Sequence, residues 1–171
     1  SVTVDATWLQ MPTHASTTSF PVTNENDPLL LSLSTGTTGI PKGPMLTHKQ
    51  MISRFITQKE SLTFRPDDRY LSATPLYFGA GRGFVMGMIH NGATVVLLAP
   101  PYAPVNLLDA ISDYQINVTL LVPTMLRRLL DFVGAGLHSL KSLRLLLSTG
   151  AILHPDERES ITHHLCPYLM N

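Results

Sequence analysis

From Leu29 onward, short apolar segments alternate with longer amphipathic ones. The apolar segments are rich in leucine and valine on both faces, which is typical of strands in a parallel sheet covered on both sides. This alternation predicts an α/β domain with a mainly parallel sheet and helices on both of its faces. The expected strands are 29–34, 68–75, 93–98, 118–122 and 143–149, and the expected helices are 47–62, 81–92, 104–115, 123–136 and 154–165.

Two of the expected helices carry clear boundary signals. Thr47 is a suitable capping residue for helix 47–62, and Pro104 stands at the start of helix 104–115. The spacing of apolar residues predicts one inward-facing set in each helix. These sets are Met51, Ile52, Phe55 and Ile56 in the first helix, and Leu107, Leu108, Ile111 and Tyr114 in the second.

The charge content narrows the classes of partner. The 171 residues contain 12 basic and 12 acidic side chains, so bulk charge does not attract the chain to nucleic acid or to an anionic membrane. Charged residues make up 14% of the chain, against about 25% in a typical globular domain. Two explanations stay open. The protein is neutral with a large core, or part of its surface is normally covered, which predicts self-association through exposed core surface.

The cysteine content and the hydropathy pattern indicate a location. Cys166 is the only cysteine, so no internal disulfide forms, and we expect a buried, inert thiol in a reducing compartment. The first residues lack the basic and apolar segments of a signal peptide, and no run of about 18 apolar residues is present. These features predict a soluble protein of the cytoplasm.

Residues 34–43 depart from the short turn expected after a strand. They include three glycines, four hydroxyl side chains and Lys42 at the carboxyl end of a strand, where ligands bind in parallel sheets. The backbone N–H groups of such a loop bind anions, and the hydroxyls and the lysine suit a polyphosphate. The loop is not the common P-loop, because Pro41 precedes Lys42 and Gly43 follows it. A solvated Gly/Thr-rich loop without a ligand is the structural alternative.

The string STGTTGIPKG at 34–43 closely resembles the signature phosphate loop of the adenylate-forming superfamily. That superfamily holds acyl- and aryl-CoA synthetases, luciferases and the adenylation domains of nonribosomal peptide synthetases. The resemblance extends through residues 45–48, 73–81, 91–100, 118–130 and 140–155. It predicts an extended lead-in over 1–26 and a partial AMP-binding domain over 27–171, which stops before the family's Tyr-Gly-x-Thr-Glu-type motif.

The resemblance implies an ATP-dependent carboxylate–CoA ligase, which forms an acyl-adenylate and then an acyl-CoA. ATP, Mg²⁺ and CoA are the implied cofactors and co-substrates, and a small carboxylic acid is the implied partner. Lys42 is the implied catalytic residue, and Tyr77, Phe78 and Gly79 are expected to line the acid pocket. The implied nucleotide-binding residues are Ser34, Thr35, Gly36, Thr37, Thr38, Gly39, Lys42, Gly150 and Ala151. The 171 residues alone are expected to be inactive.

Two other functions stay open. An adenylation module that loads a carrier protein would use the same loop. A non-catalytic nucleotide-binding or interaction module would keep the fold without the reaction. Phe78, Thr149 and Ile152 depart from the family's pattern and favour that second alternative, because many acyl-CoA synthetases carry a histidine where Phe78 stands.

The remaining polar residues are interpreted as structural. Arg127 and Arg128 could contact a phosphate, but a solvated helix face is the preferred interpretation. The acidic pairs at 67–68 and 156–157 are expected at a turn and at a helix start, where the helix dipole favours negative charge. His163 and His164 are adjacent, so they point to different sides of a helix, and no metal site is expected.

Overall fold

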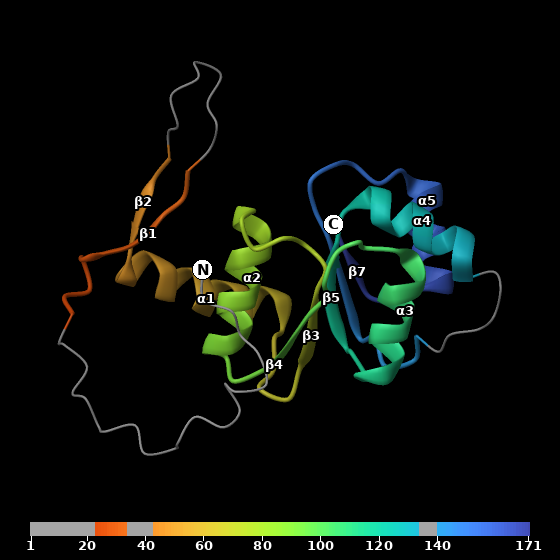
Figure 1. Cartoon of the computed structure of the whole chain (residues 1–171), viewed down its shortest axis with the longest axis horizontal. Helices are drawn as coiled ribbons and strands as arrows, with labels where there is room; N and C mark the ends of the chain where they lie inside the picture. The colour runs from red at the N-terminus through yellow and green to blue at the C-terminus, as the bar shows by residue number, and fades with distance from the viewer. Residues whose placement is uncertain (1–22, 34–42, 134–139) are drawn as a thin grey trace.

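The computed structural model describes residues 23–33, 43–133 and 140–171. Its centre is a five-stranded sheet with the order β4-β3-β5-β6-β7, in which every neighbouring pair is parallel (Figure 1). The prediction of an α/β domain with a mainly parallel sheet is confirmed. The strands are β3 (Arg69–Ser72), β4 (Thr94–Leu97), β5 (Val118–Leu121), β6 (Leu145–Ser148) and β7 (Leu169–Met170).

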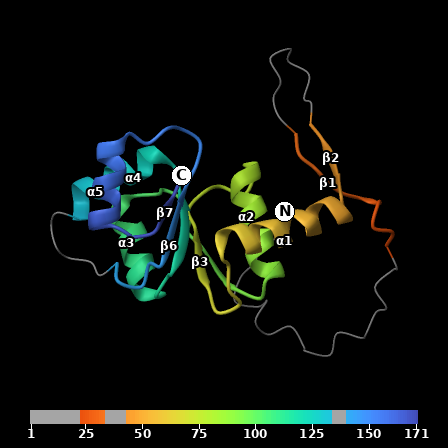
Figure 2. The same cartoon turned by 180° about the vertical axis from the view of Figure 1, so that it is seen from behind.

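Helices connect successive strands and cover both faces of this sheet. The chain steps from β3 to β4 in one direction and then passes β3 to reach β5 in the other. Right-handed crossovers therefore place the first connecting helix on one face and the later ones on the opposite face. Figures 1 and 2 show α1 and α2 on one side of the sheet and α3, α4 and α5 on the other. The connecting helices are α2 (Gly79–His90), α3 (Pro104–Asp113), α4 (Pro123–Val133) and α5 (Pro155–His164).

The central strands are apolar on both faces because both faces are covered. Tyr70 belongs to the hydrophobic cluster on the α2 side, and the next residue, Leu71, belongs to the cluster on the α3–α5 side. In β5 and β6 all four residues are buried. Side chains alternate between faces along a strand, so a continuous apolar run is what a doubly covered sheet requires.

A separate antiparallel hairpin precedes the sheet. It pairs β1 (Pro28–Leu31) with β2 (Met45–Thr47) and leads into α1 (His48–Leu62); Figure 1 shows it projecting away from the sheet. Thr47 caps α1 as predicted: its Oγ1 accepts from the Gln50 N–H at 3.3 Å, and Gln50 Oε1 accepts from the Thr47 N–H at 3.0 Å. This reciprocal pair fixes the junction between β2 and α1.

Two predicted helix faces are partly wrong. In α1, Met51 and Phe55 are buried, but Ile52 and Ile56 are 40% and 51% exposed. The reason is that α1 packs against α2 and not against the sheet, so its buried stripe is narrow. Tyr114 is also half exposed, because it follows the last residue of α3 and no longer shares that helix's buried face.

Short elements were missed, and part of the chain is not described. Strands β2 and β7 have only three and two residues and were not predicted. The lead-in predicted over 1–26 lies mostly outside the described residues, and described residues 23–27 contain neither helix nor strand. No helix among the described residues has the length and apolar character needed to span a bilayer.

Candidate functional site

The candidate site lies at the carboxyl ends of β3 and β5. These strands are neighbours in the sheet, but the helices that follow them, α2 and α4, cover opposite faces. The connections that leave β3 and β5 therefore run to opposite faces of the sheet, and parallel sheets bind their ligands at such a point. A cavity of about 450 Å³, here called the strand-end cavity, opens there. Its lining consists of Ala73, Thr74, Pro75, Phe78, Gly79, Ala80, Tyr102, Leu120, Val122, Met125, Thr149 and Gly150.

The lining of the strand-end cavity is mostly apolar and carries no charged side chain. The hydroxyl of Thr74 is buried and has no hydrogen-bond partner among the described residues. A cavity of this size and character suits a ligand with an apolar body and a few polar groups.

A close backbone approach shapes one wall of the cavity. The Phe78 N–H donates to the Pro75 carbonyl oxygen at 3.0 Å, which closes the turn between β3 and α2. A Cβ atom added at Gly81 would lie 2.6 Å from the same carbonyl oxygen and 2.8 Å from that of Thr74. Glycine is therefore the residue that lets the first turn of α2 lie against the chain leaving β3.

The structure brings together three of the predicted site residues from distant parts of the chain. Phe78 and Gly79, expected at the acid, and Gly150, expected at the nucleotide, line the same cavity. Gly150 has φ +101°, a backbone conformation that favours glycine. Tyr77 packs on the Phe78 ring at 4.6 Å, but it is 76% exposed and is not part of the lining. Ala151 is likewise exposed and does not line the cavity.

The predicted phosphate-loop residues, Ser34, Thr35, Gly36, Thr37, Thr38, Gly39 and Lys42, lie outside the described residues. The described hairpin that flanks them is held together by a hydrogen bond from the Ser32 N–H to the Pro44 carbonyl oxygen at 3.1 Å. An Arg82 N–H donates to Ser32 Oγ at 3.2 Å. This contact ties the Ser32–Pro44 end of the hairpin to α2, the helix whose first turn lines the strand-end cavity.

A second cavity of about 450 Å³ continues from the first on the α1–α2 side of the sheet. We call it the Arg54 cavity. It shares Ala80, Leu120 and Thr149 with the strand-end cavity, and its other lining residues are Arg54, Leu62, Phe84, Leu147, Ser148, Met170 and Asn171. Sequence reasoning missed Arg54 and Ser148. The place of Ser148 at the end of a strand was a usable signal, whereas nothing in the α1 sequence distinguishes Arg54 from a solvated arginine.

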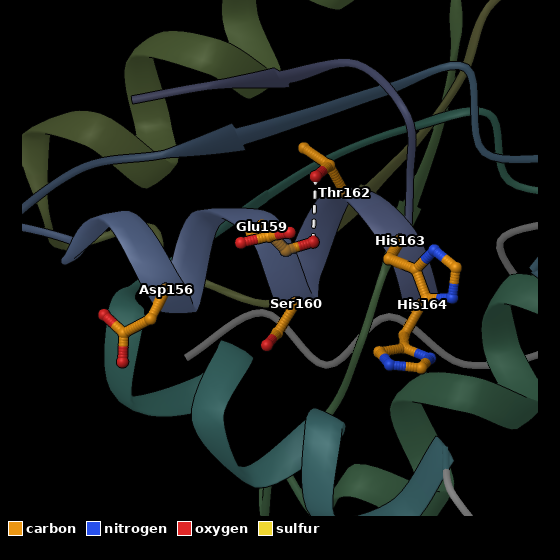
Figure 3. Close-up of a pocket in the computed structure, with 6 residues that line it drawn as sticks. All are labelled: Asp156, Glu159, Ser160, Thr162, His163 and His164. Carbon is orange, nitrogen blue, oxygen red and sulfur yellow. Dashed lines mark hydrogen bonds between the residues drawn. The ribbon is translucent and has the colours of Figure 1, made fainter.

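A polar hollow of about 650 Å³ runs along the outer surface of α5, away from both cavities. Figure 3 shows its six lining side chains, all on that helix, with the hydrogen bond from Thr162 Oγ1 to the Glu159 carbonyl oxygen. His163 and His164 lie edge to face with 4.6 Å between their ring centroids. Within 23–33, 43–133 and 140–171, no group of three or more His, Cys, Asp or Glu side chains could hold a metal ion.

Arg127 and Glu157 form an ion pair between α4 and α5. The hydrogen bond from Arg127, together with one from the His154 N–H at 2.8 Å, lowers the pKa of the Glu157 carboxyl to about 2. Arg127 thus joins two helices on the α3–α5 face and does not line the strand-end cavity. Cys166 is 1% exposed, and burial raises the pKa of its thiol, as expected of an inert thiol.

Known proteins resemble the chain in sequence and in fold. A family model for AMP-binding enzymes matches residues 3–171. Acetyl-coenzyme A synthetase of Pseudoalteromonas atlantica is 33% identical over 161 residues, which cover 89% of this chain and 25% of the relative. 4-Coumarate–CoA ligase 3 of Arabidopsis thaliana is 30% identical over 145 residues, which cover 82% of this chain and 26% of the relative.

A solved structure, the inhibitor-bound N-terminal domain of FACL13 from Mycobacterium tuberculosis, matches with a TM-score of 0.74 at 21% identity. The match covers 81% of this chain and 34% of the other, and it supports the fold alone. The chain spans about a quarter of the length of the curated relatives it matches. The family model, in contrast, extends over almost the whole chain, and we conclude that the chain belongs to the family of AMP-binding enzymes.

Proposed function

We propose that the whole protein is an ATP-dependent carboxylate–CoA ligase. One observation supports this most directly: the segments expected to hold the acid, at Phe78 and Gly79, and the nucleotide, at Gly150, line one cavity at the carboxyl edge of a parallel sheet. A carboxylate and a nucleotide that share this cavity would be held in contact, which converts a bimolecular step into an intramolecular one.

The proposed reaction has two steps. A carboxylate oxygen attacks the α-phosphorus of ATP, and the bond to the β-phosphate oxygen breaks, which gives an acyl-adenylate and pyrophosphate. A thiol then attacks the acyl carbon and releases AMP. CoA is the proposed thiol, since the relatives include an acetyl-coenzyme A synthetase and a 4-coumarate–CoA ligase.

The protein's share in the first step is positioning and charge neutralisation. We propose that Lys42 and the hydroxyls of residues 34–38 bind the phosphates, and that Gly150 and Ala151 leave room for the flat adenine ring. Mg²⁺ is proposed to enter with the phosphates of ATP, whose oxygens are the hard ligands that this ion prefers. The buried single cysteine supports a reducing compartment, for which the cytoplasm is proposed.

The 171 residues alone are proposed to be inactive and to self-associate. Leu31, Leu33 and Met45 on the hairpin are 55%, 60% and 61% exposed, and apolar surface of this kind promotes association. Sedimentation across a wide concentration range tests this. A species that stays monomeric throughout would contradict it.

ATP–pyrophosphate exchange by the whole protein, measured with short, long, aryl and amino acids, tests the proposed function. We expect exchange with one class of acid, and a loss of about a hundredfold or more in Lys42→Ala. Lys59→Ala, which changes an exposed lysine in the last turn of α1, is the matched control. ATP binding without exchange for any acid would instead favour a non-catalytic module. Exchange followed by transfer to a carrier protein, with none to CoA, would favour an adenylation module.

A further inference from the structure

We infer that the acid substrate carries a second carboxylate at its far end, and that Arg54 binds it. This inference rests on the proposed function, because it names the class of acid that the proposed ligase takes. It comes from the Arg54 cavity, which extends the strand-end cavity and differs from it in chemistry.

The two cavities form one path for a single ligand. Ala80, Leu120 and Thr149 line both of them, so the two cavities are adjacent. Ala80, the residue they share on α2, has a small side chain. A ligand whose reacting carboxylate lies near Gly150 can therefore extend its body past Ala80 into the Arg54 cavity.

The Arg54 cavity combines apolar walls with one cation. Leu62, Phe84, Leu147 and Met170 form much of its lining, and they suit a hydrocarbon body. Arg54 is its only charged lining residue. Within the described part of the chain, no acidic side chain pairs with Arg54 and no carbonyl oxygen accepts from it. Arg54 is an exposed residue of α1 that lines this mostly apolar cavity, and a carboxylate is the group that matches its planar guanidinium fork.

A second donor stands on the same lining. Ser148, the last residue of β6, is only 6% exposed, and its Oγ has no hydrogen-bond partner among the described residues. A buried hydroxyl without a partner is costly, so a ligand oxygen that accepts from it would be stabilising. Arg54 and Ser148 reach the cavity from α1 and from the sheet. An anionic oxygen between them would gain from both, whereas a methyl group there would satisfy neither.

Matched pairs of acids test this inference on the whole protein. ATP–pyrophosphate exchange is measured with hexanedioate, octanedioate and decanedioate, and with the unbranched monoacid of the same length in each case. We expect kcat/KM for at least one diacid to exceed that of its monoacid about tenfold or more, the size of effect that a charge-assisted hydrogen bond produces. In Arg54→Gln this preference for the diacid over its monoacid is expected to disappear. Arg54→Lys is expected to keep part of the preference, and Ser148→Ala is expected to reduce it several-fold.

Arg158→Gln, which changes an exposed arginine on α5, is the control. It is expected to leave the ratio of kcat/KM between each diacid and its monoacid unchanged. Equal exchange with each diacid and its monoacid, or a ratio that Arg54→Gln leaves unchanged, would overturn the inference. So would a raised KM for ATP in Arg54→Gln without a change in that ratio, because Arg54 would then serve the nucleotide.

The failure of the proposed function has a different signature, namely no exchange with any acid. Isothermal titration of the same protein with each pair then decides the inference by itself. Tighter binding of a diacid that depends on Arg54 would support it, and equal or undetectable binding of diacid and monoacid would overturn it.

Discussion

The Asp68 carboxylate accepts two hydrogen bonds from the Arg144 guanidinium, one of them from Nε at 2.8 Å, although 76 residues separate the two along the chain. The Asp68 side chain is fully buried and also accepts from the Arg65 N–H at 2.8 Å. Asp68 directly precedes β3, and Arg144 directly precedes β6. The pair therefore joins two strands at the amino edge of the sheet, across the strand β5 that lies between them.

Removing this carboxylate is expected to destabilise the chain strongly. Asp68→Ala leaves the Arg144 guanidinium and the Arg65 N–H without their acceptor, and breaking a buried pair from one side lowers the free energy of unfolding by about 3–5 kcal/mol. Urea unfolding followed by circular dichroism measures it. Asp67→Ala is the control, because Asp67 is exposed and stands next to Asp68. Equal unfolding free energies for the two variants would contradict the structural role of the pair.

Two glycines of α2 are expected to respond oppositely to the same substitution. In Gly81→Ala the new methyl group meets two backbone carbonyl oxygens closer than 3 Å, so α2 must shift and the wall of the strand-end cavity moves with it. Gly83→Ala meets no atom within 4 Å and replaces a poor helix former, which gains up to about 1 kcal/mol. The unfolding temperature and the rate of pyrophosphate exchange by the whole protein should both fall in Gly81→Ala, and neither should fall in Gly83→Ala. Similar behaviour of the two variants would show that the close approach at Gly81 does not matter.

The hydroxyl of Tyr70 is expected to cost stability. Tyr70 is 0% exposed, its hydroxyl has no hydrogen-bond partner among the described residues, and burial raises its pKa. Tyr70→Phe removes the unpaired oxygen and keeps the ring against Phe84, so the free energy of unfolding should rise by about 1 kcal/mol. Tyr114→Phe, at a half-exposed tyrosine, should leave the free energy of unfolding unchanged. A loss of stability in Tyr70→Phe would mean that the hydroxyl has a partner.

The Tyr70→Phe substitution should also change how stability depends on pH above 10. The folded pKa of Tyr70 lies above the ordinary value of 10.0, so the unfolded chain loses this proton first and the free energy of unfolding falls as the pH rises above 10. Tyr70→Phe should lack this part of the alkaline destabilisation. An unchanged slope of stability against pH above 10 would contradict the assignment.

The Arg127–Glu157 pair should make the stability of the fold depend on pH in the acid range. The pKa of Glu157 falls from 4.5 to about 2 on folding, so its contribution is present above pH 4.5 and is lost as the pH falls toward 2. Glu157→Gln should therefore unfold at a lower temperature than the parent at pH 6, and the difference should shrink between pH 4.5 and pH 2. Glu159→Gln, at an exposed acid on the same helix, is the control. A difference that stays constant over this range would exclude the charge as its cause.

The sequence predicted the sheet class and each helix found within residues 23–33, 43–133 and 140–171, because local patterns determine both. Apolar runs such as 118–122 are continuous, and Thr47 marks the start of α1 without help from the rest of the chain. The buried face of each helix was harder to predict. The exposure of Ile52 and Ile56 depends on the fact that α1 packs mainly on α2, which the α1 sequence does not reveal.

The candidate site was predictable where it follows a strand end. Phe78, Gly79 and Gly150 all lie just beyond strands, and parallel topology gathers such residues at one edge. Arg54 was not predictable, because it comes from the middle of a helix, and only the packing of α1 beside α2 brings it to a cavity. Asp68 was correctly expected at a turn, but its partner follows 76 residues later, beyond the reach of any local pattern.

The buried ion pair lies at the amino edge of the sheet, and both cavities open toward the opposite edge. Strands of four residues, about 13 Å long, separate the two. The two edges of the sheet thus differ in role: the ion pair at the amino edge holds the strands together, and the carboxyl edge lines the cavities. Mutational libraries aimed at the proposed acid site can vary the walls of the cavities while the ion pair at the amino edge keeps the strands in register. Substitutions that raise heat tolerance belong at the amino edge, where they leave the choice of substrate untouched.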